Sequence, residues 1–170
     1  DPRTGEILKG HVSLGSLRIR QDYLIAQALL GASDKIGEEN PLLQMALARI
    51  RQLSAHEIGH TLGFTHNFAA SFNNRSSVMD YPHPYIKLNN GEIDLSQAYD
   101  TGIGDWDKVT VAYSYQDFPK NVNEENELNK IIQISIDKGM KFITRTAWKN
   151  DVSEIEQADI KRKAENKDYA

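Results

Sequence analysis

Three histidines and one glutamate lie close together in the middle of the sequence. His56 and His60 are four positions apart, Glu57 directly follows the first, and His66 comes six positions after the second. On a helix, residues four apart project from the same face, so both imidazoles can reach one metal ion. A catalytic zinc ion takes three protein ligands and keeps one position open. The pattern therefore predicts a catalytic zinc site held by His56, His60 and His66.

Glu57 and Gly63 complete this pattern. Glu57 points toward the same cleft but is too close in sequence to both helical histidines to be a comfortable third ligand. It is well placed to take a proton from a water molecule that the metal activates, as a general base. Gly63 permits a sharp turn after the helix, because glycine adopts left-handed backbone angles without a Cβ penalty, and the turn returns His66 to the metal.

The composition narrows the kinds of metal site. The chain has no cysteine, so a metal must be held by His, Asp, Glu or Tyr. Structural zinc sites are normally closed by four ligands, often cysteines, which disfavours a purely structural zinc module. A zinc-containing peptide-binding domain without catalysis is the alternative to an enzyme. The presence of Glu57 favours the enzyme.

The hydrophobic pattern predicts an α+β fold that is predominantly helical. Partial alternation over residues 6–14 predicts a strand, and Asn90–Gly91 predicts a short hairpin within a long loop region. Apolar spacings of three and four predict the remaining elements. The predicted helices span residues 17–30, 42–62, 106–115, 124–138 and 153–167.

The length, charge and apolar content of the chain narrow the class of protein further. The 170 residues make about one domain, and the formal net charge of −4 argues against a nucleic-acid-binding protein. No stretch of 18 or more apolar residues exists, so we expect no membrane span in this chain. The sequence begins at Asp1 without an initiator methionine, and we expect it to be part of a larger multidomain polypeptide.

A second segment, Ser77-Val78-Met79-Asp80-Tyr81, follows the histidines. Together the two segments resemble the metzincin zinc proteases, in which a methionine sits in a tight turn (the Met-turn) beneath the zinc-bound histidines. The resemblance implies that Met79 forms this hydrophobic floor without binding the metal; an ordinary core residue is the alternative. In the astacin-like and serralysin-like branches a tyrosine in the position of Tyr81 ligates zinc and then hydrogen-bonds the tetrahedral intermediate. A tyrosine that only packs against the turn is the alternative.

The chain is most similar to large bacterial zinc-dependent metalloproteases with an internal metzincin core. The resemblance covers residues 1–118 and implies a zinc metalloendopeptidase that acts on protein or peptide substrates and is secreted, periplasmic or at the cell surface. It makes residues 1–118 the catalytic core, with an N-terminal edge strand, and residues 119–170 a helical C-terminal extension of the same domain. The segments that carry it are Asp1-Pro2-Arg3-Thr4-Gly5-Glu6-Ile7, Arg20-Gln21-Asp22-Tyr23, His66-Asn67-Phe68, Ser77-Val78-Met79-Asp80-Tyr81 and Ile103-Gly104-Asp105-Trp106-Asp107.

The chain departs from the metzincin pattern in the region before the histidines. Only 55 residues precede His56, and they are mostly helical after Leu14, so we expect the sheet to lie upstream or to be reduced. In metzincins the substrate pairs with the edge strand, here near residues 9–14. His11 and His83 are interpreted as exposed, with substrate contact as the alternative. Asp105 and Asp107 fit either a calcium site or, more simply, a helix start capped by Asp105.

Overall fold

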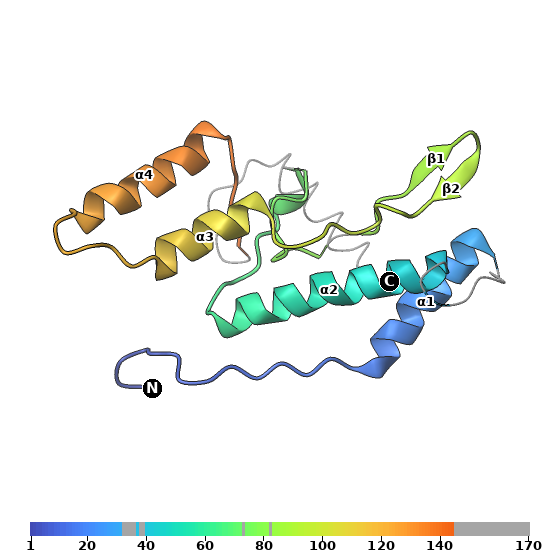
Figure 1. The fold of residues 1–170 in the computed structure, drawn as a ribbon, viewed down its shortest axis with the longest axis horizontal. Coiled ribbons are helices and arrows are strands. Elements are labelled where there is room, and N and C mark those ends of the chain that lie inside the picture. Colours follow the sequence, from blue (N-terminus) through green and yellow to red (C-terminus); the bar gives the residue numbers. More distant parts are fainter. Residues whose placement is uncertain (32–36, 38–39, 73, 82, 145–170) are drawn as a thin grey trace.

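Helices dominate the structure, as the sequence predicts. The computed structural model describes residues 1–31, 37, 40–72, 74–81 and 83–144. Within these residues the chain forms four α-helices, one 3-10 helix and one two-stranded sheet (Figure 1). The α+β, mostly helical fold class is therefore confirmed. The elements are α1 (Ser16–Leu30), α2 (Pro41–Thr61), η2 (Ala70–Phe72), β1 (Lys87–Asn89), β2 (Glu92–Asp94), α3 (Asp105–Tyr115) and α4 (Glu124–Asp137).

The long helix α2 carries two of the three histidines. It begins where the Asn40 side chain accepts hydrogen bonds from the backbone N–H of Leu42 (2.9 Å) and Leu43 (3.3 Å), with Pro41 in the first turn. It ends before Gly63, whose φ of 87° lies in the left-handed region. The chain then turns back toward the helix, as the sequence predicts.

Helix α1 packs against the N-terminal part of α2 and forms the hydrophobic core with it. The fully or nearly fully buried core residues come from α1, α2 and the segment after β2; they are Ala26, Leu42, Met45, Leu95 and Ala98. Two charged residues, Asp22 and Arg49, are buried in the same interface. Helix α1 therefore supports the N-terminal part of α2, and the two histidines of α2 lie in its C-terminal part.

The hairpin and the two later helices also agree with the sequence. β1 pairs with β2 in antiparallel register, and the turn between them has positive φ at Asn90 (54°) and Gly91 (88°). Helices α3 and α4 lie side by side. The predicted helix over residues 153–167 lies outside the described residues. None of the described helices is long and apolar enough to cross a membrane.

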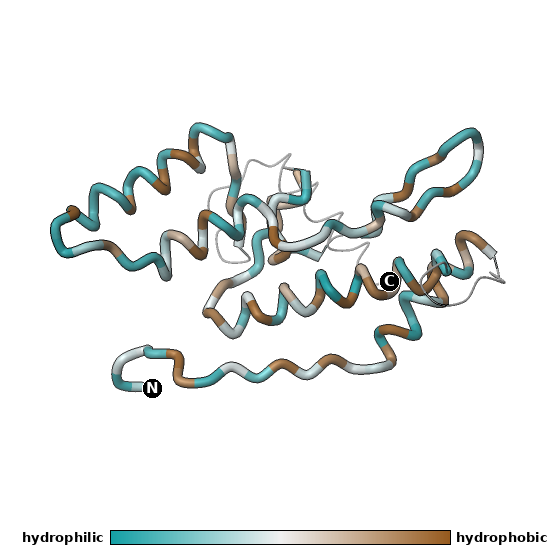
Figure 2. Tube along the Cα trace, in the orientation of Figure 1, coloured by the Kyte–Doolittle hydropathy of each residue, from teal (hydrophilic) through white to brown (hydrophobic). Residues whose placement is uncertain are grey.

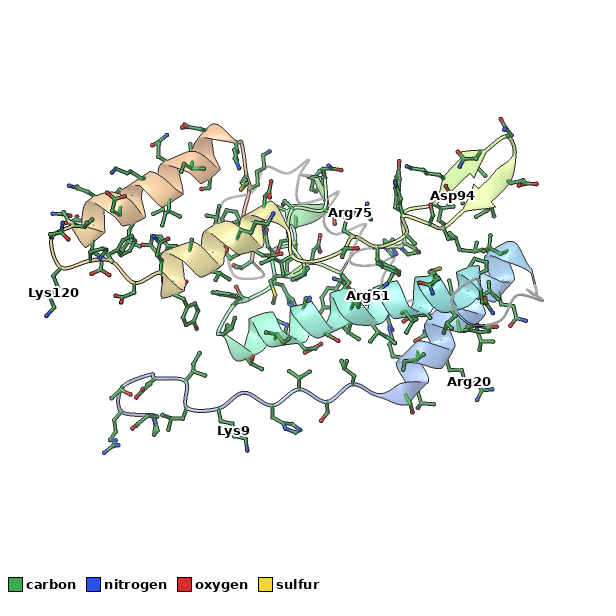
Figure 3. All side chains as sticks on the ribbon, in the orientation of Figure 1. Lys9, Arg20, Arg51, Arg75, Asp94 and Lys120 are labelled. Carbon is green, nitrogen blue, oxygen red and sulfur yellow. The ribbon has the colours of Figure 1, made fainter. Side chains whose placement is uncertain are left out.

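The predicted strand over residues 6–14 is not present. The segment is extended and runs beside α2 (Figure 1), with Gly10 packed closely against Thr61. No backbone hydrogen bond joins residues 7–14 to another part of the described chain. A strand requires such pairing, and alternation alone does not supply a partner. Apolar residues occur along the segment (Figure 2). Leu8 is 72% exposed, and Lys9 points away from α2 (Figure 3).

Candidate metal centre

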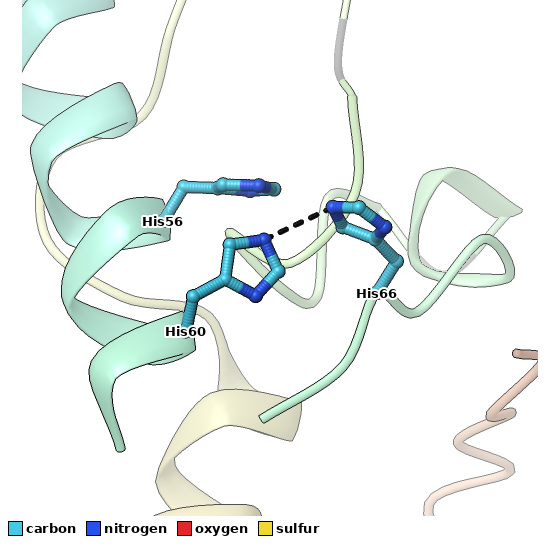
Figure 4. Close-up of side chains that lie close together, drawn as sticks. All are labelled: His56, His60 and His66. Carbon is cyan, nitrogen blue, oxygen red and sulfur yellow. Dashed lines mark hydrogen bonds between the residues drawn. The ribbon is translucent and has the colours of Figure 1, made fainter. Parts of the chain in front are cut away.

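The three imidazole rings of His56, His60 and His66 converge on one point (Figure 4). His56 and His60 come from α2 and His66 from the loop that follows it, and their possible ligand atoms all lie within 4.8 Å of one another. The Nε2 atoms of His60 and His66 are 3.1 Å apart. Two nitrogens bound to one tetrahedral zinc ion at about 2.0–2.1 Å lie roughly 3.3 Å apart. The donor set and its spacing therefore fit zinc.

Backbone carbonyl groups orient two of the rings. The Nδ1 of His56 lies 2.6 Å from the carbonyl oxygen of Val78, and the Nδ1 of His60 lies 2.9 Å from that of Phe64. A carbonyl oxygen only accepts hydrogen bonds, so each Nδ1 carries the proton and donates it. Each Nε2 is then left with a free lone pair, which is the form of histidine that binds a metal.

The surroundings of the rings favour this neutral form. Burial lowers the pKa of His56, although the hydrogen bond to Val78 opposes the change. Burial also lowers the pKa of His66, and the neighbouring His56 and His60 add to the decrease. An imidazole must be deprotonated at the ligating nitrogen to bind a metal. The surroundings of His56 and His66 therefore favour the uncharged form that binds a metal.

Met79 lies directly beneath the histidine-bearing part of α2. It is buried, with 4% of its surface exposed, and its sulfur packs against Gly59 so closely that a Cβ at this position would overlap it. The backbone N–H of Met79 donates to Ser77 Oγ (2.9 Å), and its carbonyl accepts from the N–H of Asn67 (2.8 Å). The structure thus places Met79 in a tight turn that contacts both ligand-bearing segments.

Tyr81 lies beside the imidazoles on the open side of the site. Its ring centroid is 4.7 Å from that of His66 and 5.4 Å from that of His56, and 43% of its surface is exposed. Burial raises the pKa of Tyr81, and the negative charges of Glu57 and Asp80 raise it further. The phenol therefore stays protonated at neutral pH and can donate a hydrogen bond.

Glu57 lies within electrostatic reach of the same groups. It is half-buried on α2, and its charge raises the pKa values of His56, His66 and Tyr81 against the other influences on the two histidines. The structure thus places the Tyr81 ring beside His56 and His66, and the charge of Glu57 acts on all three residues.

Asp107 is a residue of the site region whose role the sequence analysis missed. It is buried at the start of α3, and its carboxylate accepts hydrogen bonds from Ser77 Oγ and from the N–H groups of Val78 (2.8 Å) and Gly104 (2.7 Å). One carboxylate therefore holds the Met-turn and caps α3. An acid three positions after the helix cap is the signal that could have revealed it.

Asp105 does not have the predicted capping role. It is exposed and forms an ion pair with Lys108 at 2.9 Å, one turn further along α3. The cap is Gly104, whose N–H bonds to Asp107, and it approaches the Ser76 carbonyl so closely that no Cβ fits. Among the described residues, the histidine triad is the one cluster of three side chains that could hold a metal ion. The calcium alternative is therefore not supported.

Gln52 supports the site from α2 itself. Its side-chain amide donates to the Val78 carbonyl (3.3 Å), the same oxygen that accepts from His56, and Arg49 donates to Gln52 in turn. His11 and His83 are both exposed and do not belong to the triad. His11 instead lies 2.9 Å from Ser13 Oγ.

This site, with three histidines on and after one helix and a methionine turn beneath them, defines a zincin of the metzincin type. A family model described as Met-zincin matches residues 38–166, and the chain belongs to this family. The match begins after α1 and continues well past residue 118, where the motifs recognised in the sequence end. No curated protein and no solved structure matches the chain.

Proposed function

We propose that this chain is the catalytic core of a zinc-dependent endopeptidase. The observation that carries the proposal is the convergence of the His56, His60 and His66 imidazoles beside the Tyr81 ring. His56, His60 and His66 would hold the ion. Zinc bound there would supply Lewis-acid chemistry, polarising the scissile carbonyl and making a water molecule more acidic.

Glu57 would act as the general base. It takes a proton from the attacking water and later delivers it to the amine that leaves as the peptide bond breaks. Its position directly after His56 supports this role. This assignment predicts that Glu57 is needed for hydrolysis but not for metal binding.

Tyr81 would stabilise the charge that develops on the substrate. Its protonated phenol can donate a hydrogen bond to the oxyanion formed when water adds to the carbonyl. Its ring lies next to His66 and His56, two of the residues that would hold the ion, which supports this role.

The substrate would be an extended protein or peptide segment. Residues 9–14 are themselves extended, and their backbone groups have no partner in the described chain, so they are free to pair with another strand. Glu57 and Thr61 share one face of α2, and Gly10 packs against Thr61. The extended segment therefore passes along the side of the helix that carries Glu57. This arrangement supports binding of the peptide between residues 9–14 and the metal centre.

The resemblance to bacterial metalloproteases extends the proposal to cellular context. We propose that the chain works as part of a larger multidomain polypeptide that is secreted, periplasmic or at the cell surface. Its partner would be a protein or peptide, not a nucleic acid, which agrees with the net charge of −4.

A peptidase assay with chelator tests the proposed function. The zinc-loaded chain is incubated with casein and with a fluorogenic peptide library, before and after 1,10-phenanthroline, and then after zinc is added back. We expect hydrolysis that disappears with the chelator and returns with zinc. Glu57→Gln, which keeps the size of the side chain but removes its basicity, should bind zinc and lose about 100-fold or more of the activity. Stoichiometric zinc without hydrolysis in the wild-type chain would instead identify a catalytically silent binding domain.

A further inference from the structure

Asn67, the residue after the third histidine, has a buried side-chain amide. Both its N–H donor and its carbonyl acceptor form hydrogen bonds within the protein. Its exposed surface is 0%. The side-chain Nδ2 donates to the carbonyl of Lys141 (3.0 Å), and Oδ1 accepts from the N–H groups of Ile143 (3.1 Å) and Ala69 (3.2 Å). A buried amide that donates and accepts at once cannot be replaced by a carboxylate or an apolar group without leaving a polar partner unmatched.

These bonds join the loop of the third histidine to a segment more than seventy residues away. Residues 141–143 follow α4, and Figure 1 shows this part of the chain descending beside the loop that follows α2. The N–H of Phe68 adds a further bond to the carbonyl of Ile143 (2.9 Å). Phe142 stacks on Trp106 of α3, with ring centroids 5.3 Å apart. Residues 141–143 therefore contact both the loop that follows α2 and helix α3.

The backbone of Asn67 is fixed from the opposite direction. Its N–H donates to the carbonyl of Met79 at 2.8 Å. The peptide group that follows His66 is therefore held by the Met-turn, while the side chain of the next residue is held by residues 141–143. Of the three ligands, His66 alone lies outside α2, so its position depends on these contacts rather than on a helix.

We infer that Asn67 is a positioning residue for His66, and that residues 141–143 are a structural part of the metal centre. The inference rests on the proposed zinc site and assigns a role to the C-terminal part of the domain, which carries no recognised motif. Asn67 does not touch the metal; it sets where the third imidazole lies. Residues that orient metal ligands typically change metal affinity about 10–100-fold when they are mutated.

Zinc affinity of an Asn67→Asp variant, measured by competition with a chromophoric chelator, tests the inference. The substitution keeps the shape and the acceptor but replaces the donor to Lys141 with a repelling oxygen. By charge alone, a new carboxylate near the site would strengthen zinc binding. A weakening of about tenfold or more in a variant that remains folded therefore indicates displaced ligand geometry, and this is the result we expect. Asn129→Asp, on the exposed surface of α4, is the control for the added charge.

A second variant changes residues 141–143, the segment that Asn67 contacts. Phe142→Ala removes the stacking on Trp106 and loosens residues 141–143 without altering Asn67, and it should also weaken zinc binding. Thermal unfolding of the metal-free proteins, recorded in parallel, separates the possible outcomes. Unchanged zinc affinity in both variants, with or without a lower unfolding temperature, would show a merely structural role and overturn the inference. A wild-type chain that binds no zinc would overturn the proposed function itself, and the positioning role with it.

Discussion

The sulfur of Met79 rests on the backbone of Gly59, in the helical turn between the two histidines of α2. A side chain at Gly59 would occupy the space of this sulfur, so the Met-turn can lie directly against the helix only because residue 59 is glycine. The contact brings together two segments that are twenty residues apart in the sequence. It also explains why a residue with poor helix propensity lies inside α2.

Gly59→Ala should destabilise the protein although alanine favours helices. Overpacking of a core typically costs about 1–3 kcal/mol, which exceeds the gain of about 1 kcal/mol from replacing glycine in a helix. In a Met79→Ala background the space is free, and the same substitution should become neutral or stabilising. Urea unfolding of the four proteins measures both effects. An equal loss of stability in the two backgrounds would show that the contact with Met79 is not the cause.

Asp107→Asn should loosen the Met-turn. The amide cannot accept from all three donors that surround the carboxylate, and hydrogen bonds to charged groups contribute about 1.5–3 kcal/mol each, so we expect a loss of about 2–4 kcal/mol in unfolding free energy. Asp105→Asn makes the same chemical change two residues away on the exposed surface. It should leave the unfolding transition nearly unchanged, and similar losses in both variants would refute the specific role of Asp107.

Tyr81→Phe should lower turnover without releasing zinc. Removal of one hydrogen-bond donor to an oxyanion typically costs about 100-fold or more in kcat. The ring, and therefore its packing against His66, is kept. Tyr85→Phe, in an exposed tyrosine of the following segment, is the matched control. Steady-state kinetics together with metal analysis provides the test. An unchanged kcat would show that Tyr81 has only a packing role.

The buried carboxyl of Asp22 predicts an unusual dependence of stability on pH. Burial raises its pKa above 3.8, against the opposing charges of Arg18 and Arg49. As pH rises through 3.8, the unfolded chain releases this proton while the folded chain retains it, so the contribution of Asp22 to stability falls until pH passes the folded pKa. Asp22→Asn does not titrate. Its unfolding temperature relative to wild type should therefore increase with pH from 3.5 upward and then level off.

Thermal unfolding of wild type and Asp22→Asn across this pH range is the measurement. Asp117→Asn, which removes an exposed charge, corrects for the change in net charge. A difference between Asp22→Asn and wild type that stays constant, or declines with rising pH, would contradict the cause given for the raised pKa.

Local patterns in the sequence predicted the elements that position the site. The spacing of His56 and His60, the glycine after the helix and the turn at Asn90–Gly91 each act within a few residues, so sequence alone could place them. The strand predicted over residues 6–14 was wrong because a strand depends on a partner elsewhere in the chain, which alternation does not reveal.

The residues that support the metal centre could not be predicted from local sequence patterns. Asp107 acts on a turn about thirty residues before it, and Asn67 acts on a segment more than seventy residues after it. Neither pairing follows from spacing, since only the folded chain brings these segments together. The sequence predicts Asp105 as the helix cap because it stands at the predicted start of the helix, whereas the cap is Gly104 and the buried Asp107 accepts a hydrogen bond from its N–H.

Zinc titration of the metal-free chain, compared with His66→Ala, tests the central claim most directly. Three imidazoles that converge as these do should bind one zinc ion per chain. His66→Ala should bind it far more weakly, because only the two ligands on α2 remain. Isothermal titration and elemental analysis give the stoichiometry and the affinity. Failure of the folded wild-type chain to bind one equivalent of zinc, or equal affinity in His66→Ala, would contradict the account.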